Sequence, residues 1–262
     1  MKNVEFKRKG DTGIIVLGNP PDHQLSRAFA DDLLVSVHEA SVSDIRALVI
    51  RAEGPNFGTG GDVPEWPGKD ENWFRTFIAE VNQAYTAIEA LRIPVIAAVQ
   101  GQVVSGHYEL ALRADLILAA ESATFTWVEP TSAMTPLAGG VQRLTERIGR
   151  SRATAHIMLA QTISATDAER FGLVHQVVPD NQLEGSALAL GERLAAGATK
   201  SHAATKALIK AWSAGGVPGA DALMLDLSMD LFTTTDAQQA FAAITRSKSA
   251  DEPYTPPKFS GQ

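Results

Sequence analysis

Two glycine-containing loops and two glutamates are the residues of this sequence best suited to catalysis. The segments Thr59-Gly60-Gly61-Asp62 and Ser105-Gly106-His107-Tyr108-Glu109 each place a glycine where a loop passes into a helix, and Glu129 follows further along. Backbone N–H groups at such positions can hold an oxyanion, and a carboxylate beside it can take or give a proton. The combination predicts an enzyme that polarises a carbonyl group and moves protons next to it.

The surroundings of the two glutamates indicate burial. Glu109 directly precedes Leu110-Ala111-Leu112, and Glu129 lies in the apolar stretch Phe125–Pro130. Burial raises the pKa of a carboxyl group, and a second carboxylate nearby raises it further. A glutamate in a first helical turn otherwise only complements the helix dipole, and a single glycine loop is commonly a plain turn. It is the pairing of the loops with the glutamates that favours a site.

Short apolar runs that alternate with amphipathic helices position these residues. The runs Ala47–Ile50 and Val95–Val99 are typical of parallel strands buried on both faces, and a glycine loop follows each. Parallel strands bring such loops to the same edge of a sheet. Ser26 is expected to cap a helix that continues to about Ala40. We therefore predict an α/β fold with the site at one edge of the sheet.

The chain divides into two parts by its pattern. From Asn181 onward the sequence reads as almost wholly helical, whereas strands and helices alternate before it. We predict an α/β core with the active site over residues 1–195 and a helical region over residues 196–262.

Composition excludes several functional classes. The 262 residues carry a formal net charge of −7, which disfavours nucleic acid or an anionic membrane as a partner. There is no cysteine, which excludes thiolate zinc sites and a cysteine nucleophile, and no histidine pair has metal-site spacing. The segment Gly101–Gly106 lacks the lysine of a phosphate-binding loop, and no dinucleotide fingerprint opens a first βαβ unit. Without a signal-like N-terminus or a long apolar run, a cytoplasmic protein without metal is expected.

Several motifs together resemble the crotonase superfamily, the enoyl-CoA hydratase/isomerase family. The resemblance runs from about Gly18 to Pro179 and includes segments similar to the family patterns F-x-A-G-x-D, P-V-I-A-A-V-x-G, G-G-x-E-L-A, P-G-x-G-G-x-Q-R-L and A-x-x-A-x-x-x-G-L-V. In this chain these segments are Asn56–Asp62, Pro94–Gly101, Gly106–Ala111, Pro136–Leu144 and Ala165–Val174.

The resemblance implies a fold and a reaction. The fold would be a spiral of ββα repeats with a helical C-terminal oligomerisation region that forms a homotrimer or a dimer of trimers. The N–H groups of Gly61 and Gly106 would hold the thioester oxygen of an acyl-CoA substrate. Glu109 would orient and deprotonate water, and Glu129 would exchange a proton with Cα. The enzyme would be a hydro-lyase that needs no cofactor besides the CoA of its substrate.

Departures from the family pattern affect the pocket and leave alternatives open. His23 and Gln24 stand where Asn-Ala is usual, and Leu137 stands where hydratases have glycine. A CoA-independent β-diketone hydrolase, an enoyl-CoA isomerase and a non-catalytic, RNA-binding or scaffolding homologue are the alternatives. The diketone hydrolases use histidine near the position of Glu129, and the acidic balance argues against the RNA-binding homologue. We expect the substrate to contact five further residues, namely His23, Asp62, Trp66, Trp127 and Leu137.

Overall fold

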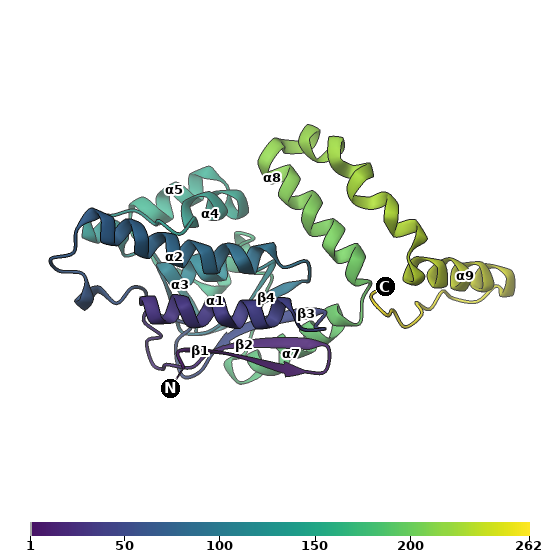
Figure 1. The fold of residues 1–262 in the computed structure, drawn as a ribbon, viewed down its shortest axis with the longest axis horizontal. Coiled ribbons are helices and arrows are strands. Elements are labelled where there is room, and N and C mark those ends of the chain that lie inside the picture. Colours follow the sequence, from purple (N-terminus) through teal and green to yellow (C-terminus); the bar gives the residue numbers. More distant parts are fainter. Residues whose placement is uncertain (1) are drawn as a thin grey trace.

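The computed structural model describes residues 2–262 and contains one large and one small β-sheet (Figure 1). The large sheet has the order β1-β2-β3-β4-β6-β9, in which β1 and β2 form an antiparallel hairpin and the later pairs are parallel. Its strands are β1 (Val4–Lys9), β2 (Thr12–Leu17), β3 (Ala47–Ala52), β4 (Val95–Val99), β6 (Leu116–Ala120) and β9 (Gln176–Val178).

A small sheet lies beside the large one and gives the chain its spiral course. It has the order β5-β7-β8, with β5 (Gln102–Val104) parallel to β7 (Thr124–Thr126) and β7 antiparallel to β8 (Ile163–Ser164). A strand of the large sheet, a strand of the small sheet and a helix follow one another twice, as β4-β5-α3 and as β6-β7-α4. This succession is the ββα repeat that the resemblance implied. The segment 101–106, expected to be only a loop, contains β5, because Gln102 to Val104 pair with β7.

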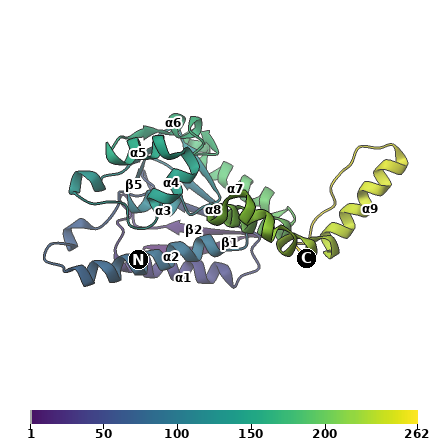
Figure 2. The same ribbon diagram turned by 90° about the horizontal axis from the view of Figure 1, so that it is seen from above.

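Helices cover both faces of the large sheet, which explains its continuously apolar strands. The helices α1 (Arg27–Ser41) and α2 (Glu71–Ala90) lie on one side and α7 (Leu183–Ala195) on the other (Figure 2). Alternate residues of a strand point to opposite faces, so Ile50 packs beneath α1 and α2 while Val49 packs beneath α7. Ser26 caps α1 by accepting a hydrogen bond from Phe29 N, as predicted.

Short helices complete the core around the small sheet. They are α3 (Gly106–Ala111), α4 (Gly140–Ile148), α5 (Arg150–Met158) and α6 (Ala165–Arg170), together with the 3₁₀ helices η1 (Val63–Glu65), η2 (Glu129–Ser132) and η3 (Asp180–Gln182). Both proposed glutamates lie at helix beginnings, Glu109 in the first turn of α3 and Glu129 at the start of η2.

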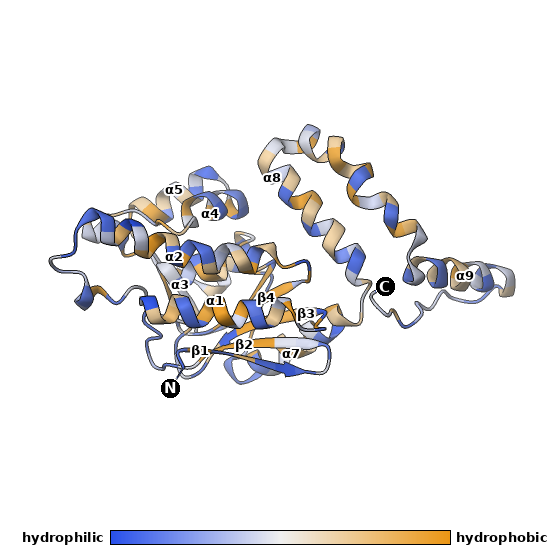
Figure 3. Ribbon diagram, viewed as in Figure 1, coloured by the Kyte–Doolittle hydropathy of each residue, from blue (hydrophilic) through white to orange (hydrophobic). Residues whose placement is uncertain are grey.

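The C-terminal helices extend away from the sheets. The helix α8 (Thr199–Ser228) bends at Gly216, whose φ of 63° is not helical, and η4 (Met229–Thr233) and α9 (Thr235–Ala250) follow (Figures 1 and 2). Apolar residues colour this part orange in Figure 3, and large ones such as Trp212, Leu225 and Phe232 are exposed. The helix α7 ends at Ala195. The division into residues 1–195 and 196–262 and a role of the latter in assembly stay predictions.

Among residues 2–262, none of the helices combines the length and the apolar character that crossing a bilayer requires.

Candidate active site

The loop after β3 and the loop after β5 lie side by side. Gly58 N donates to Gln102 O at 3.0 Å and Val104 N donates to Gly58 O at 3.0 Å, so the first loop runs parallel to β5. A Cβ atom built on Gly60 would lie 3.4 Å from Ser105 Cβ, an ordinary contact distance. The structure thus brings together two segments that are 45 residues apart in the sequence.

Backbone pairing leaves N–H groups unused in these two loops. Leu25 N donates to Gly60 O and Asp62 N donates to Leu25 O, which uses the main-chain groups on either side of Gly61. Gly106 is the first residue of α3, where an N–H has no partner within the helix. Neither N–H finds an acceptor among residues 2–262. Both groups are therefore free to bind an oxygen atom of a ligand.

Glu109 is a buried carboxylate held by the main chain. Only 4% of the residue is exposed, and its Oε1 accepts hydrogen bonds from Ala138 N and Gly140 N, each at 2.8 Å. These two donors lie where the preceding loop enters α4, a segment of four residues that we call loop 137–140. The bonds fix the carboxyl group in one orientation within the core.

Burial controls the ionisation of Glu109. The pKa of its carboxyl group is raised to about 7, and loss of hydration is the largest cause. The negative charge of Glu129 also raises this pKa, while the two N–H donors and Arg113 lower it. A carboxyl group with such a pKa can accept or donate a proton near neutral pH.

This pKa gives Glu109 a measurable effect on stability. Because the folded-state pKa lies above the usual value of 4.5, the folded chain binds the proton more tightly than the unfolded chain does. The stability associated with the protonated form is complete below pH 4.5 and is lost as pH rises to about 7. We expect Glu109→Gln to remove this pH-dependent loss of stability. Relative to wild type, the unfolding free energy of the variant should therefore rise by about 3 kcal/mol as the pH increases from 4.5 to 8.

Chemical denaturation of the two proteins across this pH range measures the effect. A difference between them that does not change with pH would mean that Glu109 ionises in the folded chain as it does in the unfolded one.

Glu129 is half-buried and is held by a side chain of the second glycine loop. Its Oε2 accepts a hydrogen bond from Ser105 Oγ at 2.9 Å. Burial raises the pKa of Glu129, and hydrogen bonds from its own main chain, from Ser105 and from the main chain of Val128 partly offset this rise. A side-chain hydroxyl group thus contributes to the hold on Glu129 but not to that on Glu109, and each glutamate has a raised pKa.

Ser105 is a functional candidate that the motifs did not reveal. It stands directly before α3 with a φ of 51°, in the left-handed region that favours glycine. Its hydroxyl group does not cap α3 but donates to Glu129. A serine beside a loop glycine is the only signal visible in the sequence, because the hydrogen-bond partner of Ser105 lies 24 residues further on.

Two of the predicted substrate contacts lie at the first glycine loop. A Cβ atom on Gly61 would lie 2.5 Å from Trp66 Cζ2, so the indole ring lies against this glycine, and it meets Phe74 edge to face. Asp62 is half-buried directly after Gly61, and its side chain does not cap η1. Both residues therefore lie next to Gly61.

The other three predicted contacts have different surroundings. Trp127 is fully buried and stacks on Tyr108, with 4.5 Å between the ring centroids, so it packs beneath the site. The side chain of Leu137 is largely exposed at the start of loop 137–140. His23 is fully buried, and its ring hydrogen-bonds to main-chain groups, accepting from Asn19 N at 3.2 Å and lying 2.8 Å from Glu53 O. These bonds give His23 a structural role, and its contact with the substrate stays a prediction.

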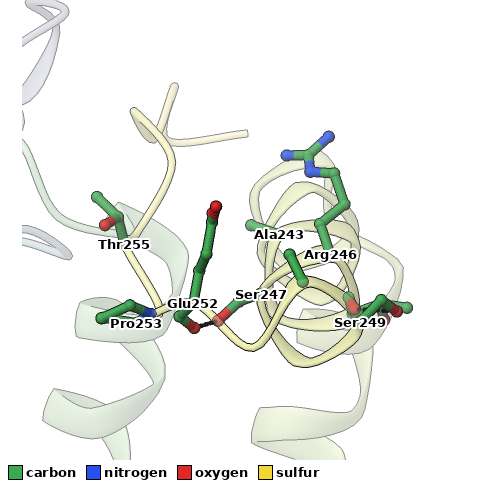
Figure 4. Close-up of a pocket in the computed structure, with 9 residues that line it drawn as sticks. Ala243, Arg246, Ser247, Ser249, Glu252, Pro253 and Thr255 are labelled. Atoms are coloured by element: carbon green, nitrogen blue, oxygen red, sulfur yellow. Dashed lines mark hydrogen bonds between the residues drawn. The ribbon is translucent and has the colours of Figure 1, made fainter.

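An open hollow on the surface lies elsewhere. Residues of α9 and of the segment after it line this hollow, and Ser247 Oγ donates to Glu252 O across one end (Figure 4). It contains none of the residues considered above and lies at the far end of the molecule from α3 (Figure 1).

Comparisons with known proteins bear on the family and the fold of the chain. The family model described as enoyl-CoA hydratase/isomerase matches residues 8–249. A probable enoyl-CoA hydratase of Rhodobacter capsulatus is 29% identical over 260 residues, which cover 99% of this chain and 98% of the relative. One from Mycobacterium bovis is 33% identical over 187 residues, covering 70% and 71%. The crystal structure of an enoyl-CoA hydratase from Bacillus anthracis has a TM-score of 0.89 at 26% identity, covering 99% of this chain and all of that one.

The resemblance noted in the motifs thus extends over nearly the whole chain and to the fold. The chain belongs to the enoyl-CoA hydratase/isomerase family and is an enzyme of that family.

Proposed function

We propose that this enzyme adds water across the α,β double bond of an enoyl-CoA thioester. One observation carries the proposal: two glutamates with raised pKa lie near two free glycine N–H groups. Glu109 is buried and accepts from the main chain of loop 137–140, and Glu129 is half-buried and accepts from Ser105 Oγ. Family membership supports acyl-CoA as the substrate class.

The proposed reaction assigns one task to each group. Glu109 takes a proton from water as the water oxygen bonds to Cβ, and the electrons of the double bond move toward the thioester oxygen. The N–H groups of Gly61 and Gly106 stabilise the negative charge that develops on this oxygen. Glu129 then delivers a proton to Cα, which completes the addition. Residues Asp62 and Trp66 are proposed to contact the acyl thioester beside Gly61.

Hydration of crotonyl-CoA and of a longer enoyl-CoA tests the proposal through the loss of the ultraviolet absorbance of the conjugated thioester. A parallel incubation with a cyclic β-diketone tests the CoA-independent alternative. Cleavage of the diketone without loss of either thioester would overturn the hydratase assignment.

Ser105 offers a further prediction. We expect Ser105→Ala to lower kcat about tenfold, because Glu129 loses the hydroxyl group that orients its carboxylate. Ser105→Gly loses the same hydroxyl but relieves the positive φ, so it should be as slow as Ser105→Ala yet more stable by about 1 kcal/mol. Steady-state kinetics and thermal unfolding of both variants separate the two effects. Unchanged kcat in both would show that Glu129 needs no support from Ser105.

We also propose that residues 196–262 mediate assembly into a homotrimer or a dimer of trimers. The exposed apolar side chains of α8 and η4 support this, since a lone chain leaves them in water. Light scattering after size-exclusion chromatography measures the assembly. A cytoplasmic location and independence of any cofactor besides the CoA of the substrate stay predictions.

A further inference from the structure

Loop 137–140 is held from behind by side chains of three separate elements. Each of its first three carbonyl groups accepts a hydrogen bond: Leu137 O from Asn82 Nδ2 at 3.1 Å, Ala138 O from Arg113 Nη2 at 2.5 Å, and Gly139 O from Arg143 Nη1 at 3.1 Å. Asn82 belongs to α2, Arg113 follows α3 and Arg143 belongs to α4. The loop is therefore fixed through its main chain.

The same peptide groups hold Glu109 on their other side. The peptide between Leu137 and Ala138 accepts from Asn82 and donates its N–H to Glu109. The peptide between Gly139 and Gly140 accepts from Arg143 and donates its N–H to Glu109. A hydrogen bond to the carbonyl oxygen of a peptide polarises that peptide and strengthens the bond made by its N–H. Each donor to Glu109 is thus oriented and polarised by one side chain behind it.

The supporting side chains also bind one another. Glu89 accepts two hydrogen bonds from Arg143, at 2.7 and 2.6 Å, and one from Arg113 at 3.2 Å. Arg113 donates to Asn82 Oδ1 at 3.1 Å, and only 3% of its side chain is exposed. We call Asn82, Glu89, Arg113 and Arg143 the support cluster.

We propose that the support cluster positions Glu109 for its reaction by fixing and polarising the two N–H donors of loop 137–140. Asn82 and Arg143 are positioning residues, since they act on the carboxylate through the loop. Arg113 acts through the loop and also directly through its charge. The assignment of Glu109 as the base rests on the proposed function, but its dependence on the support cluster does not.

The charged and titratable groups that act on Glu109 make this dependence measurable. Glu129 raises the pKa of Glu109 and Arg113 lowers it, and the hydroxyl group of Tyr85 stays neutral because burial raises its own pKa. Removing Arg113, or loosening the loop through Arg143, should therefore raise the pKa of Glu109 further. An increase of about one pH unit is expected for Arg113→Met.

The experiment uses pairs of proteins that differ only at Glu109. For wild type and for Arg113→Met, Arg143→Met and Asn82→Ala, the unfolding free energy is measured from pH 4 to pH 9 with Glu109 and with Glu109→Gln. Within each pair, the difference in unfolding free energy stops changing with pH above the folded-state pKa of Glu109. We expect this levelling point to lie at higher pH in the three variants. We also expect kcat for crotonyl-CoA hydration to fall about tenfold or more in them, with little change in KM.

Arg147→Met is the matched control. Arg147 lies on α4 one turn after Arg143 and also donates to main-chain carbonyls, but these belong to Leu112 and Ala114 outside the loop. The Arg147→Met variant should lose stability without a change in the pKa of Glu109. If Arg113→Met does not fold, Asn82→Ala tests the inference instead, since it removes only one small side chain from α2.

The outcomes are distinct. An upward shift in the three variants, absent from Arg147→Met, supports the inference. An unchanged folded-state pKa of Glu109 in both Asn82→Ala and Arg143→Met overturns it, since Arg113→Met raises this pKa through loss of its charge alone. The shift without any hydration by wild type supports the inference about Glu109 and overturns the proposed function.

Discussion

Replacing Glu129 with glutamine is expected to lower the hydration of crotonyl-CoA by a factor of about 10²–10⁴, the usual contribution of one positioned proton donor. The amide has nearly the shape of the carboxyl group and can still accept the hydrogen bond from Ser105, so the fold should be kept. The residual hydration rate is measured in stopped assays. The concentration of the variant enzyme is raised by about the factor by which its activity falls.

Glu109→Gln provides the comparison for this result. Its amide oxygen can still accept from Ala138 N and Gly140 N, but it cannot take a proton from water. It should lose hydration as severely as Glu129→Gln, yet keep more of any double-bond isomerisation, which needs only the group that exchanges a proton with Cα. Full hydration by both variants would show that the two glutamates are not the reacting groups.

Gly140→Ala is expected to have the second large effect. A Cβ atom at this position would lie 2.8 Å from Glu109 Cγ, 2.9 Å from Glu109 Oε1 and 2.5 Å from Trp127 Cη2. Trp127 is fully buried, so the carboxylate or loop 137–140 must move. We expect a loss of about 10² in kcat through misplacement of Glu109, and a loss of about 1–3 kcal/mol in stability through overpacking.

Gly185→Ala is a suitable control for the same chemical change. Gly185 lies in α7, and a Cβ atom there has nothing within 4 Å. This variant should keep its activity and gain up to about 1 kcal/mol from the higher helix propensity of alanine. Urea unfolding of both variants measures the change in stability, and crotonyl-CoA kinetics measure the change in kcat. Wild-type kcat in Gly140→Ala would mean that the exact placement of Glu109 is unimportant for the reaction.

Local patterns predicted the fold because they depended on neighbouring residues. The apolar run Ala47–Ile50 lies within β3, Val95–Val99 is β4, and the cap at Ser26 starts α1. Assignment to the crotonase family and the α/β fold are confirmed by the family match and by the structural neighbours. The strand β5 was not predicted, because its three residues are ordered by pairing with β7 rather than by their own periodicity.

The site was predictable where main-chain geometry sets it and unpredictable where distant side chains do. The two glycine loops could be expected to meet, since each follows a parallel strand. The substrate contact proposed for His23 followed from its position beside a loop, whereas its partners, Asn19 and Glu53, became visible only in the folded chain. The same holds for Ser105, whose φ and whose bond to Glu129 depend on the turn before α3. The roles of the glycines and glutamates stay predictions until the variants are measured.

In loop 137–140 the main chain holds Glu109, whereas the side chain of Leu137 faces solvent. Glu109 is held by peptide N–H groups, and every residue except proline supplies such a group. Leu137 at the start of the loop turns a side chain that is 48% exposed away from this interaction. Its identity can therefore change over evolution without altering the hold on the carboxylate. Relatives that share this loop can therefore differ in the substrates they bind, while the carboxylate at the position of Glu109 keeps its place.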